Sequence, residues 1–504
     1  MTMKPLVRVM GRSTACRAFA AVMVILSVFI QASCSAQTSR GSSEYREFKD
    51  QRGRTVLARV VDVSAGTVTI QRKDGRKFTI EISVLSQTDR DYIGTLTKAS
   101  NSEATSDNWF CFRGPGGMGV SSAKGLPLKW DADTNIAWKT PLPGAGASSP
   151  ITFGDHIYLT CYSGYLVPDE PGGSLDRLQR HLIALRRDTG ETVWDKAISA
   201  KLPEEERIRD HGYAANTPAA DADRVYAFFG KTGVFAFDHE GKQIWQADVG
   251  SNTSGWGTAA SPVLYKDMVI INASVESESL VALERETGRE KWRASEIREA
   301  WNTPIIVTAQ SGRQELVVAR HGDVLAFDPD SGAPLWSCKT DISWYMVPTG
   351  VAADGIVYYL GGRSGTAALA VRAGGSGDVT ATHRLWTSTA GSNVTSPIYL
   401  DGHLYWISES QGIAYCAVAA TGELVYEQRL DRFGGVYASP VLAEGRLYYF
   451  DRSGSTLVLA AKPEFEQLAV NRIEGDRTSF DGSPAVDGTR LLMRSGKYLY
   501  CLGQ

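Results

Sequence analysis

The chain has 504 residues, of which 43% are hydrophobic and 22% are charged, and its formal net charge is -3. A chain of this length can bury large cores, and its balanced charge excludes nucleic acid as a partner recognised by bulk positive charge. Fifty glycines and twelve tryptophans indicate many tight turns and many large apolar anchors. This composition is typical of short-stranded β repeats rather than of helical proteins.

The first segment, residues 1–36, has the pattern of a secretory signal peptide. It begins with Lys4 and several arginines, continues with the apolar core "AFAAVMVILSVFI" at 18–30, and ends in the small residues of "QASCSA". We predict cleavage near Ala36 and export to the periplasm or the cell envelope. A membrane anchor is the less favoured alternative, because the apolar run is shorter than the roughly 20 residues that span a bilayer. No transmembrane span is therefore expected after removal of the leader.

The seven cysteines predict neither a metal site nor a redox pair. Removal of the leader takes Cys16 and Cys34, and the other five have no CxxC or CxxH spacing. Cys34 leaves a lipoprotein alternative open, although Gln31 stands where a lipobox normally has an aliphatic residue. Cys416 and Cys501 fall at small positions of a repeated strand and are expected to be buried.

Residues 44–95 predict a small barrel of short antiparallel strands. Alternating apolar residues in "TVLARVVDV", "TVTIQR" and "KFTIEI" are separated by the turns "SAG" and "KDG". A short helix should follow, because Ser86 and Asp89 in "LSQTDRDYI" have the spacing of a capping box. The polar run "LTKASNSEATSD", residues 96–107, has no periodicity and predicts a linker.

This segment resembles the SLA-homology domain, a small SH3-like fold. The resemblance implies an SH3-like barrel and peptide binding, and a spacer barrel without a ligand is the alternative. The matching positions are Phe48, Asp50, Gly53, Arg54, Asp74, Gly75, Arg76, Leu85, Ser86, Asp89 and Tyr92.

From residue 108 to residue 504 the chain repeats itself. A glycine stands four residues before a tryptophan in copies such as "DTGETVW" and "ETGREKW", and prolines recur in phase with this motif at Pro150, Pro218, Pro262, Pro304, Pro348, Pro397, Pro440 and Pro484. Eight markers and about four short strands per unit predict an all-β, eight-bladed β-propeller. The aromatic positions of the repeat are Trp138, Trp194, Trp245, Trp292, Trp336, Trp386 and Tyr426.

The glycine and the tryptophan of the motif are both expected to serve the fold. The glycine supplies the positive φ of a tight hairpin, and alternation along the next strand directs the tryptophan into the gap between blades. The ends of the repeat also predict how the ring closes. "NIAWKTPL", with Trp138, has no blade of its own and should complete the last blade, which removes an exposed edge.

The pattern "ALxxxTGxxxW" in eight units resembles the pyrroloquinoline-quinone-like propellers. That group holds quinoprotein dehydrogenases and the non-enzymatic lipoprotein of the outer-membrane barrel-assembly machine. "NWFCFRGPGGMGVS" at 108–121 is similar to secreted bacterial members of unassigned function. The resemblance covers 108–504 and implies the fold much more than an activity.

The resemblance leaves open whether the protein is an enzyme. A quinoprotein dehydrogenase would hold pyrroloquinoline quinone with calcium and usually has two adjacent cysteines, and no such pair occurs here. Nor is there a serine-nucleophile, HExxH or P-loop motif. We therefore expect no catalytic residue, no metal and no cofactor, with the quinone and calcium as the alternative.

The loops that precede the prolines give the best candidate for a site. They should line one mouth of the central channel, where convergent aromatic and charged side chains can bind a ligand, although large rings that only plug the channel are the alternative. The candidate residues are His211, Tyr213, Trp256, Arg298, Glu299, Trp301, Asn302, Trp344, Tyr345, Asn393, Tyr437, Arg477 and Asp481.

These observations predict an exported binding or assembly scaffold with protein or peptide partners in the cell envelope. The alternative is an enzyme or sensor that uses a small ligand, pyrroloquinoline quinone or a sugar, in this funnel.

Overall fold

The computed structural model describes residues 39–40, 45–51, 53–64, 67–73, 76–90, 92–93, 108–170, 172–431 and 433–503. The leader with Cys34 and the linker predicted at 96–107 lie outside these residues. The chain divides into two compact units, residues 1–105 and 106–504. Among the described residues, no helix is both long and apolar enough to cross a membrane.

The first unit is built on a five-stranded antiparallel sheet. Its order is β1-β3-β4-β5, and β2 also pairs with β3, so the sheet includes two residues before the predicted start at 44. Val68 and Ile70 alternate into a core that also holds Phe48 and Leu85. The elements are β1 (Ser39–Arg40), β2 (Arg46–Lys49), β3 (Thr55–Ser64), β4 (Thr67–Arg72), β5 (Lys77–Glu81) and the 3-10 helix η1 (Ile82–Val84).

Ser86 caps the helical turn as predicted, but the reciprocal bond of a capping box is replaced, because the Ser86 backbone N–H donates to the carbonyl of Lys49 over 2.7 Å. The Ser86 hydroxyl donates to Asp89 Oδ2 over 2.7 Å, and the Asp89 backbone N–H donates to Ser86 Oγ over 3.2 Å. The same carboxylate accepts bonds from the Arg46 guanidinium, at 2.9 Å, and from the Lys49 backbone, at 2.8 Å. Asp89 therefore fastens the helical turn to β2. The likeness of this unit to SH3-like barrels stays a prediction.

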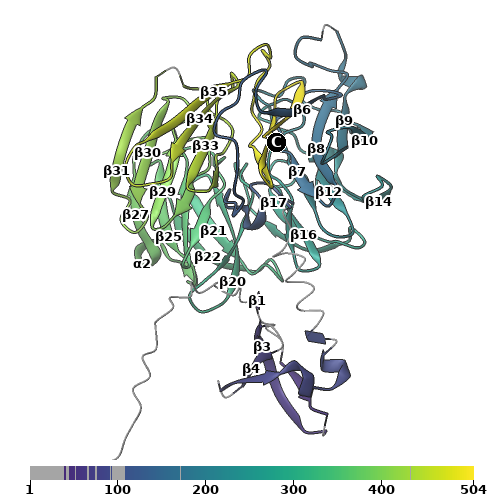
Figure 1. Ribbon diagram of the computed structural model, residues 1–504, viewed down its shortest axis with the longest axis vertical. Helices are drawn as coiled ribbons and strands as arrows, with labels where there is room; N and C mark the ends of the chain where they lie inside the picture. The colour runs from purple at the N-terminus through teal and green to yellow at the C-terminus, as the bar shows by residue number, and fades with distance from the viewer. Residues whose placement is uncertain are drawn as a thin grey trace, which may run out of the picture. The chain divides into compact units, whose positions relative to one another are not determined.

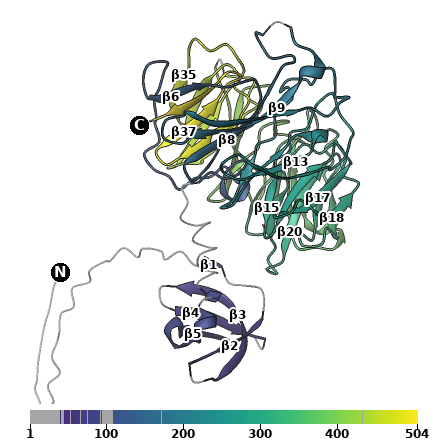
Figure 2. The same cartoon turned by 90° about the vertical axis from the view of Figure 1, so that its right-hand side faces the viewer.

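The second unit is a ring of eight antiparallel sheets, which confirms the eight-bladed propeller (Figures 1 and 2). Seven blades follow one another along the chain, each with its innermost strand first. A short parallel strand, β26 (Gly377–Asp378), is added to the fourth sheet, and a turn of helix, α2 (Thr380–His383), comes before the last strand of the fifth. The short 3-10 helices are η2 (Pro115–Gly117), η3 (Leu175–Arg177) and η4 (Gly230–Thr232).

The strands of the first four blades are β7 (Ile151–Phe153), β8 (His156–Ser163), β9 (Gln179–Arg186), β10 (Thr192–Ser199); β11 (Ala219–Ala220), β12 (Val225–Phe228), β13 (Val234–Phe237), β14 (Gln243–Ala247); β15 (Val263–Tyr265), β16 (Met268–Ala273), β17 (Ser279–Glu284), β18 (Glu290–Ser295); and β19 (Ile305–Thr308), β20 (Gln314–Arg320), β21 (Asp323–Phe327), β22 (Pro334–Lys339). Two insertions lengthen the first unit of the repeat. One lies between β8 and β9, and the other between β10 and β11.

The strands of the last four blades are β23 (Val351–Ala353), β24 (Ile356–Leu360), β25 (Ala368–Arg372), β27 (Arg384–Ser388); β28 (Ile398–Leu400), β29 (His403–Ile407), β30 (Ile413–Val418), β31 (Leu424–Arg429); β32 (Val441–Ala443), β33 (Arg446–Phe450), β34 (Ser455–Ala460), β35 (Gln467–Arg472); and β36 (Ala485–Asp487), β37 (Arg490–Arg494), β38 (Tyr498–Leu502), β6 (Ile136–Pro141). The eighth blade thus combines both ends of the propeller sequence.

The predicted closure of the ring is confirmed. Strand β6 pairs antiparallel with β38, with Trp138 opposite Cys501 (Figure 2). Cys501 is fully buried in this sheet, as is Cys416 in β30, and the cysteines of the described part of the chain are free. The N-terminal strand therefore supplies the outer edge that the last blade would otherwise expose.

Removal of residues 136–142 should open the ring. The last blade would lose its fourth strand and present the unpaired edge of β38, so we expect a sharply lower melting temperature and aggregation. Thermal unfolding and light scattering of the deletion variant measure both effects. A deletion variant that melts like the parent would contradict the closure.

The glycines of the repeat touch the tryptophans of the preceding blade. A Cβ atom placed on Gly332 would lie only 2.5 Å from the Trp292 ring, so the absence of a side chain is what lets the ring pack there. The glycine also has a φ of +71°, as the hairpin requires. The corresponding pairs are Gly190 with Trp138, Gly241 with Trp194, Gly288 with Trp245 and Gly422 with Trp386.

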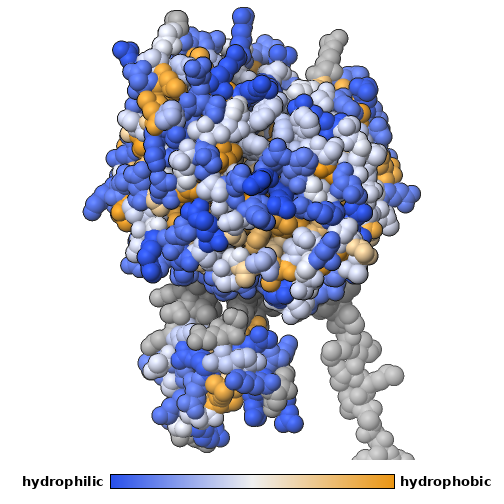
Figure 3. Space-filling model, turned by 180° about the vertical axis from the view of Figure 1, so that it is seen from behind, coloured by the Kyte–Doolittle hydropathy of each residue, from blue (hydrophilic) through white to orange (hydrophobic). Residues whose placement is uncertain are grey.

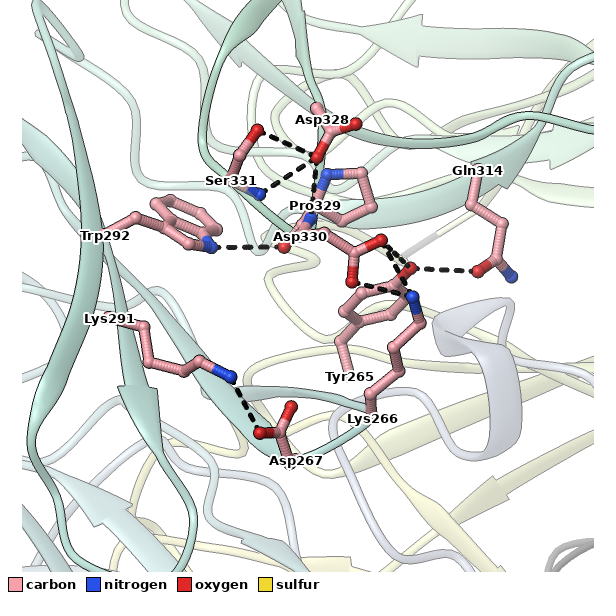
Figure 4. A network of polar contacts seen from close by, with 10 residues as sticks. All are labelled: Tyr265, Lys266, Asp267, Lys291, Trp292, Gln314, Asp328, Pro329, Asp330 and Ser331. Atoms are coloured by element: carbon pink, nitrogen blue, oxygen red, sulfur yellow. Dashed lines mark hydrogen bonds and ion pairs between the residues drawn. The ribbon is translucent and has the colours of Figure 1, made fainter. Parts of the chain in front are cut away.

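In four of these five contacts the indole N–H also donates to a backbone carbonyl of the next blade, as Figure 4 shows for the third and fourth blades. The Trp138 indole N–H has no hydrogen-bond partner among the described residues. The Trp292 indole N–H donates to the carbonyl of Pro329 over 3.2 Å, and Asp328 accepts the backbone N–H of Ser331 over 2.9 Å. Lys266 pairs with Asp330 across the same gap. The tryptophan is therefore both packed against the next blade and hydrogen-bonded to it.

Trp336 follows a different pattern. The next blade has no "TG" hairpin at this place, because the stretch with β26 and α2 stands there instead. The Trp336 indole N–H donates to Oε2 of the fully buried Glu315 over 2.7 Å, and Arg313 neutralises the other oxygen of that carboxylate at 2.6 Å. At this junction the indole N–H is therefore accepted by a carboxylate paired with an arginine, where other blades use a backbone carbonyl.

A pair of glycine substitutions separates packing from backbone strain. Gly332→Ala should lower the free energy of unfolding by ~2–5 kcal/mol, because it combines a strained φ with a collision against Trp292. Gly445→Ala should cost only ~1–2 kcal/mol, since its φ is +69° but no atom lies within 4 Å of the new methyl group. Denaturant unfolding measures both. Equal losses would show that the tryptophan contact contributes nothing.

Residues 108–121 lie at the axis of the ring. Their backbone oxygens accept hydrogen bonds from Thr152, Ala220 and Leu442, which lie on the innermost strands of three different blades. Arg113, which is almost fully buried, donates to the carbonyls of Pro397, at 2.5 Å, and Met118, at 3.1 Å. Because the innermost strands surround the axis, a segment that touches several of them fills the channel.

Candidate binding site at the channel mouth

Four aromatic side chains form a cluster at the mouth of the channel. The Tyr345 ring lies 5.5 Å from Trp256, 5.2 Å from Trp301 and 5.0 Å from Trp344, measured between ring centroids. The Trp301 indole N–H donates to the carbonyl of Gly257 over 2.8 Å, which fixes its orientation. The four residues come from the loops before the third, fourth and fifth blades and are partly exposed. We call them the aromatic cluster.

Two arginines border the aromatic cluster. The Arg209 guanidinium lies 5.0 Å from the Trp256 ring, and Arg363 lies 4.8 Å from the Trp344 ring. Both side chains are exposed, and neither forms an ion pair with any residue that the structure describes. A positive charge over an aromatic face is favourable. Because both guanidinium groups are also exposed, a partner could bind them.

A second, charged cluster is centred on Arg452. Its Nε donates to Asp481 Oδ1 over 2.7 Å, its guanidinium lies 4.2 Å from the Tyr437 ring, and Asp210 lies within 3.7 Å. Burial raises the pKa of Asp481, and Arg452 opposes that rise. Burial lowers the pKa of the neighbouring His211. In this cluster the arginine is paired with carboxylates of the chain itself, unlike the arginines beside the aromatic cluster.

The insertion between β10 and β11 reaches both clusters. The Arg209 backbone N–H donates to the carbonyl of Gly255 over 3.0 Å, before the third blade. One residue later, the carbonyl of Asp210 accepts a bond from Arg452 of the seventh blade over 3.4 Å. The insertion therefore crosses the mouth and covers part of it with the chain itself.

Some candidate residues lie in the wall and not in the open mouth. Asn302 is 1% exposed, and its amide donates to the carbonyls of Ala319, at 2.5 Å, and Met346, at 3.3 Å. Asn393 is buried, and its backbone N–H donates to Glu409. Asn302 differs from the expectation because its amide group completes the backbone bonding of the loops, whereas the buried Asn393 Oδ1 has no hydrogen-bond partner among the described residues.

The other candidates divide by exposure. Tyr213 is buried beneath the insertion, where its hydroxyl donates to the carbonyl of Glu205. Arg298 pairs with Glu278, and Glu299 pairs with His321, all at the surface. Arg477 is also exposed. The structure brings together Trp256, Trp301, Trp344 and Tyr345 in one cluster and His211, Tyr437 and Asp481 in the other.

Sequence reasoning missed the arginines of this mouth. Arg363 and Arg452 lie in turns between the second and third strands of their blades, and Arg209 lies in the insertion. In an up-and-down blade those turns come to the same face as the loops before the prolines. Counting arginines in these turns as well as in the loops would have found them.

The residues of the mouth do not suit calcium or another metal ion. The part of the chain that the structure describes contains no group of three or more His, Cys, Asp and Glu side chains placed to hold a metal. Asp481 is bound by Arg452, and Glu409 accepts bonds from the loop of Asn393. These two carboxylates are therefore engaged with groups of the chain itself.

Two tryptophan substitutions test the division between fold and site. Trp292→Ala should cost ~3–5 kcal/mol of unfolding free energy, because Trp292 is 8% exposed and packed between blades. Trp301→Ala should cost only about 1–2 kcal/mol, since the ring is partly wet and loses mainly one hydrogen bond. Denaturant titrations of both variants give the comparison. An equal loss would make the aromatic cluster a structural plug.

Several solved structures share this fold. The BamB of Moraxella catarrhalis is 15% identical, with a TM-score of 0.52, over 73% of this chain and 97% of that one. A europium-containing methanol dehydrogenase is 11% identical, with a TM-score of 0.60, over 81% of this chain and 100% of that one. The quinohemoprotein alcohol dehydrogenase of Comamonas testosteroni is 12% identical, with a TM-score of 0.57, over 82% of each chain.

The sequence itself matches a family model described as outer membrane protein assembly factor BamB, at residues 116–295, 179–426 and 320–464. No curated protein sequence matches the chain. The matched residues run without a gap from 116 to 464 and cover more than half of the chain. The repeated glycine–tryptophan contacts and the closed ring of eight blades are the structural counterpart of that match, and the chain belongs to the BamB-like family of pyrroloquinoline-quinone-like propellers.

Proposed function

We propose that this protein is an exported binding or assembly scaffold whose propeller docks an acidic segment of a protein partner at the channel mouth. The observation that carries the proposal is the aromatic cluster with Arg209 and Arg363 stacked on its two sides. Aromatic and arginine side chains are the residues most often decisive in protein interfaces.

The charges at the mouth indicate the chemistry of the partner. Asp481 is paired with Arg452, and Glu299 is hydrogen-bonded to His321, whereas Arg209 and Arg363 have no acidic partner within the described residues. A carboxylate of a partner could pair with either arginine while its apolar neighbours contact the tryptophans. The face seen in Figure 3 is mostly hydrophilic, with apolar residues in small, scattered groups.

The family supports a scaffold in the envelope. The matching model is that of an outer membrane protein assembly factor, and the leader predicted at 1–36 would export this chain to the same compartment. The first unit would then add a second binding module, as its likeness to peptide-binding SLA-homology domains implies. The competing proposal is a quinone or sugar ligand at the mouth, as the shared fold of the alcohol dehydrogenases suggests.

Photo-crosslinking in the native envelope tests the scaffold. A photoreactive amino acid replaces Ser343, which is exposed beside the aromatic cluster, or Val470, which is 59% exposed on the outer strand β35. We expect the probe at 343 to capture one defined protein through an acidic segment, and the probe at 470 to capture none. Identical capture from both positions, or a stoichiometric quinone or sugar on the purified chain, would overturn the proposal.

Once the partner is known, the two arginines give a quantitative test. The double variant Arg209→Gln and Arg363→Gln should weaken binding about two- to thirtyfold, because each of the two exposed charge pairs contributes about 0.2–1 kcal/mol. Added salt should weaken the parent more than the variant. Arg186→Gln is the control, since Arg186 is an exposed arginine on β9 paired with Asp188. A binding titration in which the double variant equals the control would contradict the charge argument.

A further inference from the structure

A separate pocket lies beneath the insertion, between the first three blades. It contains about 290 Å³ of space outside the atoms, part of which is open to solvent. Its wall includes the buried side chains of Arg180 at the start of β9, Lys231 on η4 and Glu276 in the turn between β16 and β17. Glu204 of the insertion closes it. The expectations drawn from the sequence include none of these four residues.

Arg180 is held in place but keeps one donor free. It is 2% exposed, its Nη2 donates to Glu204 Oε2 over 2.5 Å, and its Nη1 donates to the carbonyl of Tyr213. Its buried Nε has no hydrogen-bond partner among the described residues. Lys231 is also buried and donates to the carbonyl of Pro203. Two cations therefore line the pocket, and only one of them is paired with a carboxylate.

Glu276 also has an unused polar atom. The residue is 2% exposed, and its Oε2 is buried with no hydrogen-bond partner in the described part of the chain. Burial raises the pKa of this carboxyl to about 8. Glu276 is therefore protonated and neutral at pH 7, and its O–H can act as a donor.

The wall is closely packed at Gly230, where a side chain would not fit. Gly230 has a φ of +56°, and a Cβ atom there would lie 2.9 Å from Thr258 and 3.1 Å from Glu276 Oε1. Gly257, which accepts the Trp301 indole N–H, also lines the pocket. The pocket is narrow, so it suits a small ion better than a large ligand.

We propose that this pocket binds a small oxyanion, of the carboxylate, phosphate or sulfate class, between Arg180, Lys231 and Glu276. One such anion accepts bonds from the free Nε of Arg180 and from the Glu276 carboxyl. With Glu276 neutral, Arg180 and Lys231 outweigh Glu204 by one positive charge, which the anion balances. This site is independent of the partner proposed for the channel mouth.

The proposal has a defined pH dependence. When the pH rises through about 8, Glu276 loses its proton, so it stops donating and begins to repel an anion. The other charged groups that face it are Arg180, Lys231 and Glu204, with Glu205 behind Thr253. An arginine keeps its proton over this range, so anion affinity should fall because of Glu276.

Equilibrium dialysis of the full chain with isotope-labelled acetate and sulfate, at constant ionic strength in sodium chloride, tests the site. Both anions keep their charge between pH 7 and pH 9. We expect about one anion per chain at millimolar concentration and at least fivefold weaker binding at pH 9 than at pH 7. Lys231→Met should weaken binding at pH 7 at least fivefold, whereas Lys291→Met, at a surface lysine paired with Asp267, should not.

Glu276→Gln decides the role of the carboxyl. Glutamine cannot ionise but can still donate, so this variant should bind the anion at pH 7 and keep its affinity at pH 9. If Lys231→Met does not fold, the binding of the anion by Glu276→Gln at pH 7 and pH 9 tests the proposal alone. Absence of saturable binding below 100 mM, a folded Lys231→Met variant that binds like the parent, or a pH dependence that survives in Glu276→Gln would each overturn the proposal.

Discussion

The contact between a tryptophan of one blade and a glycine of the next holds the propeller together. It needs three things at once: a hairpin with a positive φ, a missing side chain, and a carbonyl in reach of the indole N–H. Gly332 and Trp292 meet all three. Trp138 of the closing strand packs against Gly190 without the indole hydrogen bond, so the packing part of the contact extends across the junction of the chain ends.

A closed ring brings the loops of distant blades to one mouth. The aromatic cluster joins three consecutive blades there, and the insertion between β10 and β11 extends across to Arg452 in the seventh blade. At the axis, the segment with Arg113 fills the channel. The mouth is therefore a lined surface with a floor, which suits docking of a peptide segment better than passage through a channel.

The insertion also links the two proposed sites. Its residues Glu204 and Ile208 border the anion pocket, while Arg209 stacks on Trp256 at the mouth. Gly257 lines the pocket on one side and holds the Trp301 indole on the other. The pocket and the aromatic cluster therefore share residues of the same loop, although binding of an anion does not depend on a partner at the mouth.

The sequence by itself determined the blades and their closure, because the glycine, the tryptophan and the proline of each unit have local roles that repeat with the chain. It also located the mouth loops. Tertiary structure decided which of their residues meet: it buried Asn302 in the wall and brought Arg363, from the turn between β24 and β25, over the Trp344 ring of the aromatic cluster. It alone showed the pocket of Glu276, since the desolvation of a carboxyl depends on packing among blades and leaves no periodic trace in the sequence.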